Sequence, residues 1–323
     1  MEKTIEKIKN YKIKILLLPF TFCLFTCFCF AQTLATGAPG KDAQWATAGK
    51  QAVGTSANLE SKVWFTLAQG VMTEVYYPDV TVANVHLLQF VVVNPKTKHV
   101  ESEQDAKHRI EALPIARTKD ISPIKQIGVY KTFHAPSSLS FKQVNWSESM
   151  GWAIEKSYVT NPGNNSIVMR VSFRTSIPEN ELFIYYDPSL ANSGMHDTAW
   201  SAGNYFLSSD NDKASALMCR FCKFSEMTNG FFGVNDGLTQ LKENGKITAT
   251  FSRAENGNVV QTAKITPVFS RGKKDEFSFE LGLGFGRNTN DAIKAAQDSL
   301  LKTYFKVLRE YQEGWIKYLK TLR

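Results

Sequence analysis

The sequence predicts a large antiparallel β-domain followed by a helical arm. Between Trp45 and Gly286, short β-branched and aromatic runs follow one another at intervals of roughly ten residues, separated by turn signals. Many short strands at this spacing favour a sandwich or barrel over βαβ units. After Gly286 the pattern changes to apolar residues spaced i, i+3, i+4 and i+7, which is typical of an amphipathic helix.

Residues 1–31 have the three-part pattern of a secretory signal peptide. Lysines dominate the start, an uncharged Leu/Phe-rich run fills 15–31, and small or polar residues follow Ala31. We expect cleavage after Ala31, which would make the mature chain secreted or periplasmic and free of the membrane. The alternative is an uncleaved membrane anchor, although the run is slightly short for a comfortable span.

Composition excludes a disordered chain and a nucleic-acid-binding one. The chain is 43% hydrophobic and 21% charged, as expected for a globular protein. Its formal net charge of +8 falls to about +5 once residues 1–31 are removed. The remaining Lys and Arg are scattered among acids instead of forming a basic stripe. We expect no nucleic-acid partner and no cofactor.

The mature chain keeps two cysteines, Cys219 and Cys222, in a C-x-x-C arrangement. A zinc site would need a second pair of ligands, and the histidines are singly dispersed, so no metal site is predicted. The surrounding residues alternate as in a strand, where two side chains three positions apart point to opposite faces. We therefore interpret them as strand cysteines. A disulfide would require a turn or bulge between them.

Taken in order, the segments divide into four regions. Residues 32–44 are small and polar and read as an extended lead-in, and 45–288 form the β-domain. The first strand patterns lie at 64–67, 71–77 and 87–93, and short edge strands or loops are expected at 98–125. Further strands are expected at 128–133, 139–145, 152–160, 166–175, 182–187, 204–209, 214–224, 246–252, 258–270 and 276–284.

The last region, 289–323, is predicted to be one helix. Thr289 or Asn290 can cap its start, and Asp291 lies near the positive end of the helix dipole. Gly314 weakens the pattern and marks a potential bend. The apolar stripe is long enough to need a partner surface, part of which can be the sheet.

Several motifs resemble one known family in its own order. They are Trp45 with Gly49-Lys50-Gln51 and Gly54-Thr55-Ser56, Ser61–Thr66, Thr73–Pro78, Ala83–Phe90, Asp187–Leu190 with Gly194-Met195 and Asp197-Thr198, Phe231–Gly237, Leu283–Gly286, and Tyr311 with Gly314-Trp315 and Tyr318. Over about residues 40–323 they resemble the N-terminal β-domain of bacterial glucoamylases and glucodextranases, family-15 glycoside hydrolases. The resemblance implies a two-sheet antiparallel supersandwich, as in galactose mutarotase, with a connector helix.

The resemblance also implies what the chain does. In the family, two glutamates of an (α/α)6 barrel after the connector release glucose from α-glucan ends with inversion. The sequence given stops at Arg323, where that barrel would begin, so no catalytic residue is assigned. We expect an accessory domain of an α-glucan hydrolase that is inactive alone, with a barrel that is missing or separately encoded. The expected ligand is an α-glucan or maltooligosaccharide.

The β-domain has acids of its own, but none predicts a catalytic pair. Inverting hydrolysis needs two carboxyl groups roughly 6.5–9.5 Å apart. The candidates show no spacing that demands proximity and are interpreted as surface or turn acids: Glu148, Glu155, Asp187, Asp197, Asp210 and Asp212.

Sugar contact is predicted in the loop at 192–202, which carries His196, Asp197 and Trp200. These residue types hydrogen-bond to and stack on sugars, and loops on a β-scaffold are common binding places. Trp200 can equally anchor the loop by packing.

Contact with a catalytic barrel is predicted for four aromatic residues. Tyr76 and Tyr77 are adjacent in a strand, so one faces inward and the other outward. Tyr311 and Trp315 lie in the connector helix.

Two alternative functions stay open at this stage. One is a stand-alone carbohydrate-binding module on the same fold. The other is an aldose epimerase-like enzyme, which needs a histidine acid and a carboxylate base in one groove. His86, His134 and His196 are its candidate acids, although shared fold alone is weak support for function.

Overall fold

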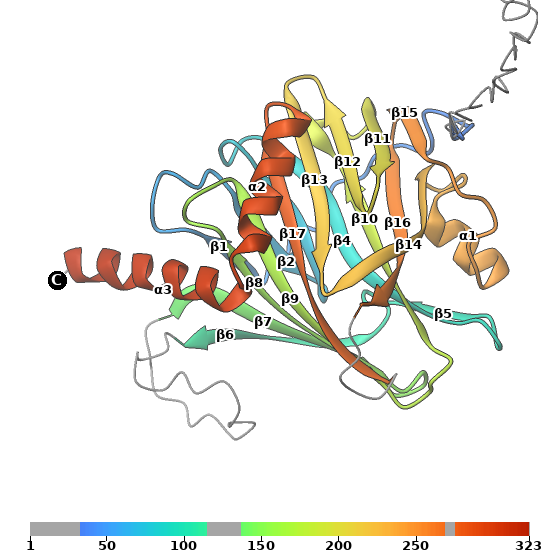
Figure 1. Ribbon diagram of the computed structural model, residues 1–323, viewed down its shortest axis with the longest axis horizontal. Coiled ribbons are helices and arrows are strands. Elements are labelled where there is room, and N and C mark those ends of the chain that lie inside the picture. Colours follow the sequence, from blue (N-terminus) through green and yellow to red (C-terminus); the bar gives the residue numbers. More distant parts are fainter. Residues whose placement is uncertain (1–32, 115–136, 269–274, 323) are drawn as a thin grey trace, which may run out of the picture. The chain divides into compact units, whose positions relative to one another are not determined.

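The structure is a computed structural model that describes residues 33–114, 137–268 and 275–322 (Figure 1). Within these ranges one sheet has eight strands, in the order β1-β2-β3-β4-β10-β16-β14 with β5 paired to β4. Their bounds are β1 Ala52–Thr55, β2 Trp64–Ala68, β3 Val71–Tyr76, β4 Ala83–Asn94, β5 His99–Ser102, β10 Glu181–Pro188, β14 Cys222–Phe231 and β16 Val259–Pro267. Residues 1–31, the strand predicted at 128–133 and His134 lie outside the described residues.

The second sheet has nine strands within the same ranges, in the order β15-β11-β12-β13-β17-β9-β8-β7-β6. Their bounds are β6 Lys107–Pro114, β7 Ser137–Ser147, β8 Trp152–Thr160, β9 Ser166–Thr175, β11 Asp197–Ala202, β12 Tyr205–Asp210, β13 Lys213–Arg220, β15 Arg253–Gly257 and β17 Glu276–Gly286. The strand neighbours in both sheets pair antiparallel. The predicted large antiparallel two-sheet sandwich is confirmed.

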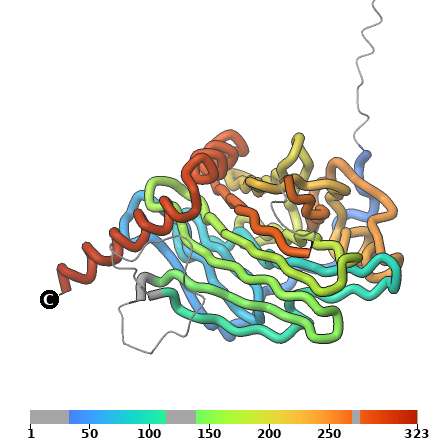
Figure 2. Tube along the Cα trace, turned by 60° about the horizontal axis from the view of Figure 1, so that its bottom comes forward, coloured from blue at the N-terminus to red at the C-terminus, as the bar shows by residue number. Residues whose placement is uncertain are grey.

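Aromatic rings from opposite sheets meet in the main core. Phe90 of β4 contacts Phe279 of β17 edge to face, with 5.8 Å between ring centroids, and Phe65 of β2 lies 5.8 Å from Tyr158 of β8. All four are fully buried. Burying side chains of this size stabilises the fold by about 1.5–3 kcal/mol each, so these contacts hold the sheets together. Figure 2 shows the stacked layers.

Helix α1 (Gly237–Asn244) covers part of the outer face of the eight-stranded sheet. Its Leu241 belongs to one buried apolar cluster with Val71, Leu87 and Phe183 of that sheet. Asp236 caps the helix by accepting hydrogen bonds from the backbone N–H groups of Leu238 and Thr239. The sequence reasoning missed this helix because it has little more than two turns. It also placed a strand at 246–252, where the chain has no regular secondary structure.

The single helix predicted at 289–323 is two helices, α2 (Thr289–Leu301) and α3 (Tyr304–Thr321). The chain turns at Lys302, whose ψ of 141° is extended, and the Thr303 side chain then caps α3 by accepting from Lys306 N. Neither glycine nor proline lies between the two helices, so the sequence did not indicate that the helix would be interrupted there. Gly314 lies inside α3.

Helix α2 packs on the outer face of the nine-stranded sheet at very short range. A Cβ atom at Gly284 would lie 2.2 Å from the carbonyl oxygen of Ala292 and 2.6 Å from the nitrogen of Ala296. Only glycine on β17 therefore allows the helix backbone to approach so closely. No helix among the described residues is both long enough and apolar enough to cross a membrane.

Candidate functional site

The residues predicted to contact sugar have three different environments. Asp197 is fully buried, and its Oδ2 accepts a hydrogen bond from Leu190 N at 3.2 Å. Burial raises the pKa of this carboxyl well above its ordinary value. His196 is exposed, with Nδ1 3.4 Å from Asn256 Oδ1. Trp200 is half-buried under the Arg253 guanidinium, 5.0 Å from the ring centroid. Their contact with a sugar stays a prediction.

A polar cluster that sequence reasoning missed lies on the eight-stranded sheet beside the part that α1 covers. We call it the His86 cluster: Lys50, Glu74, Tyr76, His86 and Asp187. His86 Nδ1 lies 2.8 Å from Asp187 Oδ2, Lys50 Nζ lies 2.8 Å from Glu74 Oε2, and the Tyr76 hydroxyl donates to that same oxygen at 2.7 Å. The side chain of His86 is 21% exposed and that of Asp187 is 3% exposed, so the histidine is the part that solvent reaches.

The charges of the cluster act on one another. Burial lowers the pKa of His86, but the hydrogen bond and charge of Asp187, with the charge of Glu74, outweigh it and leave the pKa above its ordinary value. Burial raises the pKa of Asp187, and His86 offsets this only in part. Burial and the contact with Glu74 raise the pKa of Tyr76 to about 12. Both members of the His86–Asp187 pair therefore hold protons more tightly than in water.

An epimerase-like reaction needs its acid and its base on either side of a substrate, and the contacts of the candidate histidine acids can be compared with this requirement. His86 and Asp187 bond to each other directly, and His196 contacts an amide oxygen. The third candidate acid, His134, is outside the described residues.

Of the other acids interpreted as surface or turn groups, Glu148, Glu155 and Asp212 are exposed, whereas Asp210 is buried. Glu148 lies 2.8 Å from Lys107, and Asp212 lies 2.5 Å from Lys213. Glu155 is exposed with Lys142 3.7 Å away, and Asp210 is buried at the end of β12. Among the described residues, no group of three or more His, Cys, Asp or Glu side chains could hold a metal ion.

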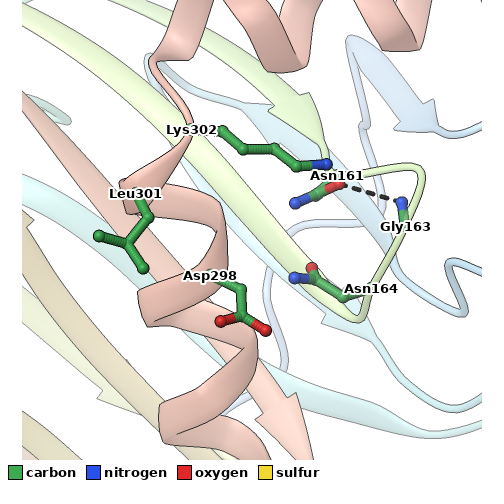
Figure 3. Close-up of a pocket in the computed structure, with 6 residues that line it drawn as sticks. All are labelled: Asn161, Gly163, Asn164, Asp298, Leu301 and Lys302. Carbon is green, nitrogen blue, oxygen red and sulfur yellow. Dashed lines mark hydrogen bonds between the residues drawn. The ribbon is translucent and has the colours of Figure 1, made fainter.

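An open pocket of about 320 Å³ lies where α2 meets the β8–β9 turn (Figure 3). Its lining is Asn161, Gly163, Asn164, Asp298, Leu301 and Lys302. The polar groups of this lining are already bonded within the chain. Asn161 Nδ2 donates to Ser299 Oγ at 2.6 Å and its Oδ1 accepts from Gly163 N, while Lys302 Nζ lies 2.9 Å from Glu310.

Asn164 completes this network. Its Nδ2 donates to Ala295 O at 3.2 Å and to Ser299 Oγ at 3.0 Å, and Ser166 Oγ donates to its Oδ1. We call the group Asn161, Asn164, Ser166 and Ser299 the α2 clasp. Two of its members belong to the β8–β9 turn, Ser166 begins β9, and Ser299 belongs to α2. The clasp therefore fixes α2 on the sandwich and thereby positions α3.

The aromatic residues predicted to meet a barrel are spread over two faces. Tyr76 points outward in the His86 cluster, whereas Tyr77 is 7% exposed and stacks on Phe285 inside the sandwich. Tyr311 is fully buried and donates to Leu139 O at 3.0 Å. Trp315 is half-buried and donates from Nε1 to Thr55 O at 2.9 Å. The opposite orientation of the two adjacent tyrosines is confirmed, and contact of the four with a partner stays a prediction.

The apolar stripe of α3 continues beyond the part that the sandwich covers. Tyr304, Val307 and Tyr311 are buried against Val159 and Val168 of β8 and β9. In the last turns the same stripe is open: Tyr318 is 46% exposed and Leu322 is 64% exposed. We call Ile316, Tyr318, Leu319 and Leu322 the α3 end patch. Figures 1 and 2 show this end of α3 running out past the sheets.

Comparison with known proteins decides the family. A family model described as "Glucodextranase, domain N" matches residues 35–320. The chain belongs to the glucodextranase domain N family. A glucoamylase of Clostridium sp. (strain G0005) is 29% identical over 299 residues, which cover 91% of this chain and 39% of that protein.

A solved structure agrees with this. The crystal structure of a bacterial glucoamylase complexed with acarbose superposes with a TM-score of 0.77 at 30% identity, covering 90% of this domain N chain and 40% of that protein. The chain thus spans about two-fifths of the length of these glucoamylases, which fits an accessory domain.

Proposed function

We propose that this domain N serves as the accessory domain of a glucoamylase-like α-glucan hydrolase and is inactive alone. The observation that carries the proposal is the α3 stripe, which is buried on the sandwich over its first half and open over its last turns. An amphipathic helix with an uncovered apolar end is stabilised by a further surface. The family and the length of the matched glucoamylases make a catalytic barrel the expected surface.

The substrate and the location belong to the same proposal. The hydrolase would act on α-glucans or maltooligosaccharides, and the barrel would be supplied in the same chain or as a separate one. Export through the signal pattern at 1–31 would bring the domain to the polysaccharide.

Activity is tested by incubating the purified chain with maltooligosaccharides and measuring glucose. The glucoamylase of Clostridium sp. is the positive control, and a boiled sample is the blank. We expect no glucose above the blank. Sustained release by the purified chain, at a rate proportional to its concentration, would show that the domain is catalytic and would overturn the proposal.

Docking is tested with the catalytic part of the Clostridium sp. glucoamylase, after circular dichroism has shown that this part is folded. Sedimentation velocity of the mixture should reveal a complex. Tyr318→Asp with Leu322→Asp should weaken it at least tenfold, because two charges would enter an apolar interface. Thr321→Asp adds a charge in the same turn without removing apolar surface, and it should bind more tightly than the double variant. Equal binding by the two variants would place the interface elsewhere.

The His86 cluster favours carbohydrate binding as a second candidate function. It offers a part-exposed imidazole, an ammonium, a phenol and carboxylates within one face, which are groups that bind sugar hydroxyls. Affinity electrophoresis in gels containing starch or dextran tests it. Retardation that His86→Ala abolishes would support binding there, whereas unretarded migration of the unmodified chain would exclude it at the polysaccharide concentrations used.

A further inference from the structure

The two cysteines lie where the chain passes from one sheet to the other. Strand β13 ends at Arg220 in the nine-stranded sheet, and β14 begins at Cys222 in the eight-stranded sheet. Between them the backbone bends at Phe221, whose φ of 67° is left-handed. The continuous strand predicted at 214–224 was therefore wrong, because this residue interrupts it and sends the chain across the sandwich.

The bend removes the obstacle to pairing that a straight strand would impose. In a strand, residues three apart are about 10 Å apart along the axis. In this turn the Cys219 thiol donates to the carbonyl oxygen of Cys222 at 3.0 Å, so the Cys219 side chain folds back onto its partner residue. Both thiols are free.

A neighbouring amide braces the arrangement. Asn204 Oδ1 accepts a hydrogen bond from Phe224 N at 2.6 Å, and its Nδ2 lies 3.6 Å from Cys219 Sγ. Asn204 thus ties the start of β14 to Cys219 near the end of β13, across the bend at Phe221.

We propose that Cys219 and Cys222 form an oxidisable dithiol that closes to a disulfide and joins the two sheets covalently. The reaction needs a disulfide oxidant, such as oxidised glutathione or a thiol–disulfide oxidoreductase. One thiolate attacks the oxidant's disulfide, forms a mixed disulfide and releases one reduced thiol. The second thiolate then attacks the sulfur of the first cysteine and displaces the other half of the oxidant. Two protein thiols lose two protons and two electrons, and the oxidant becomes two thiols.

Burial assigns the two roles. Cys219 is half-buried, whereas Cys222 is 4% exposed, and burial raises the pKa of the Cys222 thiol. Because attack requires an accessible thiolate, Cys219 reacts with the oxidant and Cys222 resolves the mixed disulfide. Cys222→Ser should therefore accumulate a glutathione adduct on Cys219, and Cys219→Ser should form its adduct at least tenfold more slowly.

The test uses the chain expressed without residues 1–31, so that these are its only cysteines. The reduced protein is incubated with oxidised glutathione, alkylated with iodoacetamide in denaturant and weighed by mass spectrometry. We expect loss of two hydrogen atoms, no alkylation, and a peptide that links the two cysteines. Dithiothreitol should restore two alkylation sites.

Unchanged double alkylation after prolonged oxidation, or a double glutathione adduct, would overturn the proposal. A folding defect is separated from a redox effect by Cys219→Ser with Cys222→Ser, which keeps the volumes and removes the chemistry. Oxidation should raise the Tm of the unmodified chain by about 4 °C and leave that of the double variant unchanged. An equal shift in both proteins would also count against the disulfide.

Discussion

Replacing Lys156 with methionine should destabilise the domain by about 3–5 kcal/mol. Lys156 lies on the inward face of β8, with Nζ 2.6 Å from Glu103 Oε1 and a hydrogen bond to Gly70 O at 2.9 Å. Both charged side chains are at most 1% exposed. Methionine fills a similar volume but leaves the Glu103 carboxylate buried without its cation, and Gly70 O keeps only the donor from Asn145.

A second substitution separates the lost charge from the lost packing. Glu103 Oε2 accepts from Phe90 N at 2.9 Å, and glutamine at this position keeps that acceptor while removing the charge. Glu103→Gln with Lys156→Met should therefore be more stable than Lys156→Met alone by about 2 kcal/mol. Lys142→Met is the matched control on the adjacent strand. Its ammonium is more than 3.5 Å from both Glu111 and Glu155, so it should cost less than about 1 kcal/mol.

Urea unfolding followed by tryptophan fluorescence measures these differences. Burial already raises the pKa of Glu103 in the intact pair. A carboxyl whose pKa is higher in the folded state binds more protons there, so the unfolding free energy of Lys156→Met should rise as pH falls from about 8 to about 5. A loss below about 1 kcal/mol, or no recovery in the double variant, would refute a buried, charge-dependent pair.

Three further predictions concern the remaining polar contacts. His86→Gln should remove a pH-dependent part of the unfolding free energy. Because the pKa of His86 is raised beside Asp187, the folded chain gains stability as pH falls from about 8 to about 6.5. Guanidinium unfolding across that range should show this rise in the unmodified chain and not in His86→Gln. Ser299→Ala should cost about 1–3 kcal/mol in urea unfolding, because it leaves the buried amide of Asn161 without an acceptor, and an unchanged midpoint would contradict this. Trp315→Phe loses the bond to Thr55 O and should cost about 1 kcal/mol, with faster hydrogen exchange in α3; unaltered exchange would place the stabilisation elsewhere.

Local patterns predicted the layers but not the polar contacts within them. The alternation of Trp152, Ile154 and Tyr158 marks the inward face of β8, and Lys156 occupies that same face. No residue near Lys156 in the sequence indicates its partner Glu103, which follows β5. The i, i+3, i+4 spacing likewise predicted the buried stripe of α3, since a helix is a local structure.

The candidate site depended on pairing between distant strands, which one sequence does not specify. His86 and Asp187 come from β4 and β10, which are neighbours in the sheet although 101 positions separate the two residues. Phe221 shows that a break within a strand pattern is equally hard to predict from the sequence. Its left-handed φ divides one apolar run into strands of two sheets, and phenylalanine is not a residue that signals such a turn.

The α2 clasp has a geometric consequence for the direction in which α3 presents its apolar residues. With α2 held on the β8–β9 turn, Lys302 and Thr303 act as a fixed joint, and the angular position of each side chain on α3 depends on the number of residues counted from that joint. Adding one residue after Gln312 would advance the α3 end patch by about 1.5 Å and rotate it by about 100°, turning Tyr318 and Leu322 to a different side. Deletions of three or four residues would nearly restore its direction while drawing it inward. The number of residues between the α2 clasp and the α3 end patch therefore sets the direction in which the patch faces.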